Sequence, residues 1–198
     1  MEEQEALWIT KALEGDDSAF GHLVEQYQRP VFSLCYRMLG NSKEAEDAAQ
    51  ESFLRAYRYL KRYDTNRSFA TWLLSIASHY CIDQMRKRRL DTVSTDALPA
   101  EIIADHNAPN PELVFRSREK EAMIQNLLNT LKPTDRAAII LRYWYQYSEI
   151  EIAESLKLSV SAVKSRLFRA RQALANGMTT AESTLSVSER RPDESPAL

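Results

Sequence analysis

Apolar residues recur three and four positions apart along most of this chain, which is the spacing of amphipathic helices. One such run covers residues 19–39 and contains Pro30, where we expect a kink or a break. Asn41 and Glu44 have the spacing of a capping box, so the next helix should begin there and extend to about Tyr63. Ser68 can cap a further helix that reaches about Leu90. Residues 1–91 are therefore predicted to form a small helical domain.

The helical pattern fades from Thr92 to Pro111, where three prolines stand among Ser, Asp, Asn and Ala. Such a composition is typical of a flexible interdomain linker, which we place at residues 92–111. Helical spacing returns over residues 112–131, 135–145, 149–156 and 160–175. After Asn176 and Gly177 the chain is rich in Ser, Thr and Glu, so residues 177–198 are predicted to be a disordered tail. The expected fold is all-α, with a second small helical domain at residues 112–176.

Residues 147–167 predict a helix, a tight turn and a second helix. Ile150, Ala153 and Leu156 should face inward in the first helix. In the second helix the inner arc is apolar: Val160, Val163, Leu167, Ala170 and Leu174. The outer arc carries small, polar and basic side chains: Ser161, Ser165, Arg166 and Arg169, flanked by Lys164 and Phe168. Small residues let a helix approach base edges and arginine can bond guanine in a bidentate manner, so this pattern indicates a helix-turn-helix reader of duplex DNA.

An ordinary helical hairpin with a solvated basic face is the alternative interpretation of these residues. The turn position that glycine commonly fills is Lys157 here. A positive φ angle at Lys157 would therefore cost conformational energy.

The helix that begins near Asn41 has two different sides. Alanines, together with Phe53 and Leu60, lie on the side predicted to be buried. The other side carries Asp47, Gln50, Glu51 and Leu54 at positions i, i+3, i+4 and i+7. An exposed leucine ringed by acids and an amide can anchor a protein partner, although single surface leucines are also normal.

The helix after Ser68 combines aromatic, polar and basic positions. Its inner arc, Phe69, Trp72, Leu73, Ile76 and Tyr80, is most simply explained as core. Its outer arc carries Thr71, Ser75, Ser78, His79 and Arg86 and leads into the basic run at residues 86–89. Together with nearby aromatic rings, these side chains can bind phosphates and stack unpaired bases.

The composition excludes several other classes of protein. The chain has 198 residues with only four Gly, which disfavours a β-sandwich, and no apolar run approaches the length of a membrane span. The acidic N-terminus lacks the order of a signal peptide, and Cys35 and Cys81 form no CxxC pair, which suits a reducing cytoplasm. The three histidines are scattered, and there is no HExxH motif, Gly-rich phosphate loop or Cys/His cluster. We therefore expect a cytoplasmic protein without catalytic residues, metal or cofactor.

The formal net charge of −2 hides a strong segregation of charge along the chain. Residues 1–54 carry −7, residues 55–90 carry +7, residues 91–131 carry −4, residues 132–174 carry +4 and residues 175–198 carry −2. Near-neutrality therefore excludes only a uniformly basic DNA-binding protein. The alternating segments fit either solvated helix faces or separate contacts with a protein and with a polyanion.

Two sets of motifs, in the same order and with the same spacing, resemble the sigma-70 family and, within it, the extracytoplasmic-function (ECF) sigma factors. The first set is residues 45–57 with Phe69 to Leu73, and the second is residues 147–156 with 163–171. The resemblance implies a dissociable subunit of bacterial RNA polymerase that recognises the minus-ten and minus-thirty-five promoter elements and promotes initiation by DNA melting. A stand-alone helix-turn-helix regulator is the alternative, but it leaves the side with Asp47 and Leu54 unexplained.

The resemblance also implies a role for each surface. Asp47, Gln50, Glu51 and Leu54 would dock on the clamp helices of the largest polymerase subunit. The minus-ten element would be bound by Asn66, Phe69, Thr71, Trp72, Ser78 and His79, with Arg86, Lys87 and Arg88 guiding the separating strands. The minus-thirty-five element would be bound by Ser161, Lys164, Ser165, Arg166, Phe168 and Arg169. The flap of the second-largest subunit would hold the second domain, and an anti-sigma factor would keep the chain inactive.

Overall fold

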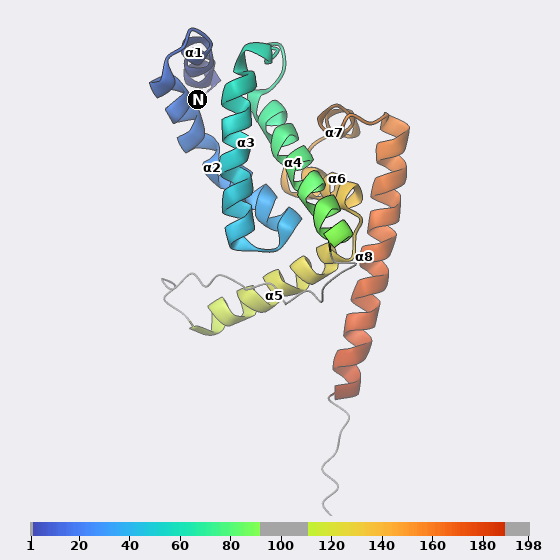
Figure 1. Ribbon diagram of the computed structural model, residues 1–198. Helices are drawn as coiled ribbons and strands as arrows, with labels where there is room; N and C mark the ends of the chain where they lie inside the picture. Colours follow the sequence, from blue (N-terminus) through green and yellow to red (C-terminus); the bar gives the residue numbers. More distant parts are fainter. Residues whose placement is uncertain (1, 92–110, 189–198) are drawn as a thin grey trace, which may run out of the picture.

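The computed structural model describes residues 2–91 and 111–188, with side chains over residues 3–90 and 119–178 (Figure 1). The helices are α1 (Glu2–Leu13), α2 (Asp17–Leu39), α3 (Ser42–Tyr59), the 3-10 turn η1 (Leu60–Arg62), α4 (Phe69–Asp91), α5 (Pro111–Asn129), α6 (Pro133–Trp144), α7 (Glu149–Leu156) and α8 (Val160–Ser188). No strand occurs in these ranges, so the predicted all-α class is confirmed. The predicted linker lies outside the described residues, except for Pro111, where α5 begins.

Local polar contacts set the ends of α2 and α3. The Asp16 side chain accepts a hydrogen bond from the Ala19 N–H at 3.1 Å and caps the start of α2. α2 ends at Leu39 and is capped by Gly40, whose φ of 74° is a left-handed conformation that glycine adopts without a steric penalty. Asn41 then accepts from the Glu44 N–H at 3.0 Å, and α3 begins where the capping pattern predicted.

α2 continues through Pro30 to Leu39, so the predicted break is absent. Buried side chains lie on both sides of the proline, among them Leu23, Val31 and Leu34. Because this face packs against α3 and α4, the helix persists despite the hydrogen bond that proline cannot donate. The Tyr145 hydroxyl also donates to the Pro30 carbonyl at 2.6 Å, a contact from a distant part of the chain.

The predicted helix-turn-helix is formed by α7 and α8. α7 begins with a complete capping box, in which the Glu151 N–H donates to Ser148 Oγ at 3.2 Å and the Ser148 N–H donates to the Glu151 carboxylate at 2.7 Å. The hydrogen bond from the Ser148 backbone keeps the pKa of the Glu151 carboxyl below its usual value. Ser159 caps α8 by accepting from the Ala162 N–H at 3.2 Å. Both helix starts are therefore fixed by serine side chains next to the turn.

α8 does not end at Ala175 as predicted but continues through Gly177 to Ser188. α5 packs against this helix, and a Cβ atom at position 177 would lie 2.8 Å from Leu127 Cδ2. A larger residue at position 177 would therefore require the Leu127 side chain to shift. Of the predicted tail, only residues 189–198 lie outside the described part of the chain.

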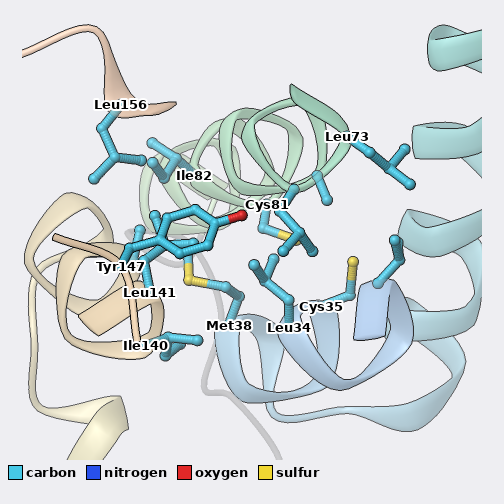
Figure 2. Close-up of a cluster of buried hydrophobic side chains, with 14 of the residues drawn as sticks. Leu34, Cys35, Met38, Leu73, Cys81, Ile82, Ile140, Leu141, Tyr147 and Leu156 are labelled. Carbon is cyan, nitrogen blue, oxygen red and sulfur yellow. The ribbon is translucent and has the colours of Figure 1, made fainter. Parts of the chain in front are cut away.

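The two groups of helices, α1–α4 and α5–α8, share one hydrophobic core (Figure 2). Figure 2 shows Leu34, Cys35 and Met38 of α2 with Leu73, Cys81 and Ile82 of α4, beside Ile140 and Leu141 of α6, Leu156 of α7, and Tyr147. α4 contacts α6 and α7 as well as α2 and α3. The two helical units predicted from the sequence are therefore both present, and they pack directly on each other.

Replacing Lys157 with glycine should stabilise the chain. Lys157 has φ 54° and ψ 48°, and its N–H donates to the carbonyls of Ala153 and Glu154 at the end of α7. A non-glycine residue in this left-handed conformation destabilises the folded chain by about 1 kcal/mol. Glycine removes this strain, but its greater conformational entropy in the unfolded chain offsets roughly half of the gain. We expect Lys157→Gly to raise the free energy of unfolding by about 0.5 kcal/mol, measured by urea denaturation. Lys157→Ala keeps the strained conformation, so an equal gain in that variant would contradict the backbone explanation.

Candidate protein- and nucleic-acid-binding surfaces

The side of α3 predicted to bind a protein, here called the acidic face, consists of Asp47, Gln50, Glu51 and Leu54. Asp47 and Gln50 are exposed, and Leu54 is 52% exposed. Glu51 is half-buried, and its carboxylate accepts from Arg55 Nε at 2.7 Å. The Arg55 guanidinium in turn lies 4.7 Å from the centre of the Tyr80 ring on α4. The acidic face is therefore accessible, with one of its two acids held in a fixed position.

A groove of about 460 Å³ lies beside the acidic face, between α2 and α3. Its lining is Val24, Gln28, Arg29 and Phe32 of α2 and Glu46, Ala49, Gln50 and Phe53 of α3. Sequence reasoning missed the α2 half of this surface. The four-residue spacing of Val24, Gln28 and Phe32 could have predicted it, because this spacing places the three side chains on one side of α2. Val24 and Phe32 are apolar, and both are half-buried in the structure. The acidic face thus continues into an open, partly apolar groove.

Four aromatic rings, here called the aromatic cluster, gather where the loop of residues 64–68 meets the start of α4. The Phe69 ring centre lies 5.5 Å from those of Tyr27 and Tyr63 and 5.6 Å from that of Trp72. The Tyr63 hydroxyl donates to the Arg67 carbonyl and so ties the loop to the cluster. Asn66 is exposed within this loop. The predicted minus-ten residues Asn66 and Trp72 are therefore brought to one end of α4.

Two of the predicted minus-ten contacts are buried. Phe69 is 1% exposed inside the aromatic cluster, and Ser78 is 0% exposed. The helical period correctly placed Phe69 on the core side of α4, but it placed Ser78 on an outer arc. α6 and α7 cover a second side of α4, so Ser78 is buried while Thr71, Ser75 and His79 of the same arc are half-buried. Phe69 and Ser78 are therefore inaccessible to DNA in this arrangement, where Phe69 supports the other rings; direct contact of either with DNA stays a prediction.

The last turns of α4, here called the basic end, expose Arg86, Lys87 and Arg88. Arg86 Nη1 lies 3.8 Å from the Asp83 carboxylate, and Arg88 Nη1 donates to Glu44 of α3 at 2.8 Å. Two turns earlier, His79 Nδ1 lies 2.8 Å from the Ser75 carbonyl oxygen. Since a carbonyl only accepts, Nδ1 is the protonated nitrogen of this ring. α4 therefore carries aromatic, polar and basic groups along one continuous helix.

The outer side of α8, here called the reader face, consists of Ser161, Lys164, Ser165, Phe168 and Arg169. All five are exposed, and Phe168 is 63% exposed. The inner arc is buried as predicted, with Val163, Leu167 and Ala170 at 0%, 3% and 1% exposure. Two ion pairs join this face to other helices, Lys164 Nζ with Glu149 of α7 at 3.7 Å and Arg169 Nη2 with Asp135 of α6 at 4.0 Å, and all five side chains stay exposed. The reader face thus presents basic side chains, small residues and one aromatic ring over about two turns of helix.

Arg166 and Ile150 do not lie as predicted. The Arg166 side chain is 28% exposed and its Nη1 donates to Asp135 of α6 at 2.7 Å, so it turns inward beside the reader face. Ile150 was expected on the inner side of α7 but is 62% exposed, whereas Ile152 is 0% exposed. α7 packs against both α4 and α8, and these two contacts together set which side of the helix is buried.

α7 and the residues before it lie against the loop and the start of α4. Thr71 of α4 lies beside the Tyr147 side chain, and Arg67 Nη1 lies 4.0 Å from the Glu154 carboxylate. Thr71 is one of the predicted minus-ten residues and is half-buried in this arrangement. Packing of the two groups therefore partly covers the predicted minus-ten surface while leaving the reader face exposed.

The end of α2 supplies the other polar contacts between the two groups. The last carbonyls of a helix have no partner within it. Here Gln125 Nε2 donates to the Arg37 carbonyl at 3.3 Å, and Arg136 Nη1 donates to the Met38 carbonyl at 2.7 Å. Burial lowers the pKa of Arg136 to about 10, so its guanidinium stays charged at neutral pH. Sequence reasoning did not anticipate these contacts.

Within residues 2–91 and 111–188, no group of three His, Cys, Asp or Glu residues is placed to hold a metal ion. None of the described helices combines the length and apolarity that crossing a membrane requires.

The surfaces above fall within two known family models: Sigma-70 region 2 matches residues 23–90, and Sigma-70 region 4 matches residues 121–174. The ECF RNA polymerase sigma factor SigW of Bacillus subtilis (strain 168) is 40% identical over 174 residues, which is 84% of this chain and 92% of that protein. The chain belongs to the sigma-70 family. The ECF RNA polymerase sigma-E factor of Escherichia coli (strain K12) is also similar, at 35% identity over 85% of this chain and 91% of its own length. The chain is thus an ECF sigma factor, a subunit with which RNA polymerase recognises promoters and initiates transcription.

Two solved structures share the fold of this sigma factor. CnrH in complex with the cytosolic domain of CnrY superposes with a TM-score of 0.66 at 23% identity, covering 89% of this chain and 98% of that one. The sigma factor RpoE in complex with the anti-sigma factor NepR, from Bartonella quintana, gives a TM-score of 0.63 at 23% identity, covering 81% and 96%. We therefore refer to helices α1–α4 as region 2 and to α5–α8 as region 4.

Proposed function

We propose that the acidic face and its neighbouring groove bind the clamp helices of the largest polymerase subunit. An exposed Leu54 flanked by Asp47 and Gln50 offers an apolar anchor inside a polar rim, which is the composition of many protein interfaces. The groove extends this surface with Phe32 and Phe53. Residues 1–54 carry a net charge of −7, so a basic partner surface would be complementary.

Region 2 is also proposed to capture the minus-ten element, through Asn66, Thr71, Trp72 and His79. An unpaired base can stack on an aromatic ring, and the free energy of capture offsets the loss of base stacking in the duplex. Arg86, Lys87 and Arg88 of the basic end would guide the separating strands through contacts with phosphates. In this proposal residues 1–91 bind polymerase and the minus-ten element, and residues 92–111 connect them to region 4.

The domain of residues 112–176 within region 4 is proposed to read the minus-thirty-five element through α8, while the flap of the second-largest subunit holds it. The observation that carries this assignment is the reader face, where five exposed side chains lie on the second helix of a helix-turn-helix. Arg169, with a side chain 58% exposed, is its best candidate for a bidentate contact with guanine.

The sigma factor would act in the cytoplasm, without covalent chemistry, and would be held inactive by an anti-sigma factor. The packed arrangement of regions 2 and 4 supports such control, because it partly covers Thr71 near the proposed minus-ten surface. Two structural neighbours are likewise described in complexes, one with CnrY and one with the anti-sigma factor NepR.

Reconstituted transcription tests the proposed function. Purified core polymerase with the full chain should initiate on genomic DNA at promoters that share a minus-ten and a minus-thirty-five sequence, and mapping the transcripts identifies both. Core polymerase alone is the control. Tight and specific duplex binding by the free chain, without initiation in the presence of core, would contradict the proposal and favour a stand-alone regulator.

Arg169→Ala tests the reader face on a promoter mapped in this way. We expect a loss of roughly 1–3 kcal/mol in discrimination at a single minus-thirty-five base pair, measured by competitive transcription from promoter variants. Arg171→Ala removes the same charge from an exposed residue outside the reader face, so it should not change that discrimination. Equal losses on all sequences would mean that Arg169 contacts a phosphate.

A further inference from the structure

A buried carboxylate lies behind the reader face. Asp135, in the first turn of α6, is 5% exposed. Its Oδ1 atom accepts from Arg166 Nη1 at 2.7 Å and lies 4.0 Å from Arg169 Nη2. Arg166 and Arg169 are three residues apart and so lie on the same side of α8, where one carboxylate oxygen reaches both.

The two arginines differ in what remains available to DNA. The Arg166 side chain is 28% exposed and its closest contact is with Asp135, whereas the Arg169 side chain is 58% exposed at the longer distance. An acid in the first turn is favoured by the dipole of α6, and the N-cap residue Lys132 makes no side-chain capping bond that would replace it. The position of the carboxylate is therefore fixed by α6 and by its hydrogen bond with Arg166. Its negative charge attracts the Arg169 guanidinium, which lies 4.0 Å away.

We propose that Asp135 is a positioning residue for promoter recognition, which holds Arg166 as a rigid support and limits the conformations of Arg169 before it meets a base pair. An arginine side chain has many rotamers, and their restriction in the free protein reduces the entropy lost on binding. In this arrangement Arg166 supports the reader face and does not itself read a base. The inference rests on the proposed function of the reader face in minus-thirty-five recognition.

The test is the transcription ratio between a mapped promoter and the same promoter with the Arg169-dependent base pair replaced, using polymerase holoenzyme. Asp135→Asn removes the charge without changing the shape of the side chain, and we expect the ratio to fall by about fivefold. In the Arg169→Ala background, Asp135→Asn should cause no further fall, because both changes act on the same contact. Glu121→Gln removes one exposed acid elsewhere in region 4 and should leave the ratio unchanged.

A purely structural Asp135 would give a different result. Loss of folded region 4 would reduce transcription from both promoters in proportion, so an unchanged ratio in Asp135→Asn overturns the proposal. Asp135→Glu keeps the carboxylate and should retain most of the discrimination, which provides a readout even if the asparagine variant is unstable. A normal effect of Arg169→Ala with no effect of Asp135→Asn would reject only this inference, whereas no effect of Arg169→Ala would reject the reader face itself.

Discussion

Replacing Arg136 with alanine should lower the free energy of unfolding of the full chain by about 3 kcal/mol. Arg136 is 4% exposed, and its Nη1 atom donates to the Met38 carbonyl at 2.7 Å and to Asn129 Oδ1 at 3.1 Å. Without the guanidinium, the carbonyl at the end of α2 loses its partner and a cavity opens between α2 and α6. Urea denaturation followed by far-ultraviolet circular dichroism measures the change.

Arg142→Ala is the matched control, because Arg142 lies on the same helix but is exposed and donates to the Tyr147 carbonyl within region 4 at 2.8 Å. Its loss should cost about 1 kcal/mol. Arg136→Ala should in addition loosen the packing of the two regions, which small-angle X-ray scattering would detect as a larger radius of gyration. Equal destabilisation by the two substitutions, with no change in radius, would show that the contact across the regions adds no stability.

Features fixed by neighbours in the sequence could be predicted. The start of α3 followed from Asn41 and Glu44, and the buried arc of α8 followed from the spacing of Val163, Leu167 and Ala170. Lys157 occupies the turn position that glycine usually fills, and it does adopt the left-handed conformation whose cost the sequence analysis considered. In each case a local hydrogen bond or a single helical period determines the result.

Features that depend on a second partner could not be predicted. Ser78 is buried because α6 and α7 cover a side of α4 that periodicity alone would leave in solvent. Arg136 finds its carbonyl partner 98 residues away at Met38. α8 continues through Gly177, beside which Leu127 of α5 packs, so a glycine that usually ends a helix lies inside one here. Arg166 similarly donates a hydrogen bond to Asp135 of α6, and the helical periodicity of α8 alone cannot predict a contact with another helix.

The acidic face should determine the affinity of this sigma factor for core polymerase. Reversing both charges, Asp47→Lys with Glu51→Lys, should weaken binding by about 100-fold, or about 3 kcal/mol, because like charges brought together across an interface cost several kcal/mol. Asp47 is exposed, and Glu51 is held by Arg55, so both charges lie on the accessible side of α3. Competition with labelled wild-type chain for a limiting amount of core polymerase measures the effect.

Glu3→Lys with Glu14→Lys makes the same change in net charge at two exposed acids in α1 and the turn after it, away from the acidic face. This control should retain affinity within a few-fold at moderate salt, because exposed charges outside the interface are screened.

Asp47→Lys alone preserves the ion pair of Glu51 with Arg55, so its effect separates charge repulsion from the loss of that pair. Leu54→Ala should weaken binding independently of salt, since it removes the apolar anchor. If the two double variants bound core polymerase equally well, the acidic face would not be the docking surface, and the groove lined by Phe32 and Phe53 would have to act without it.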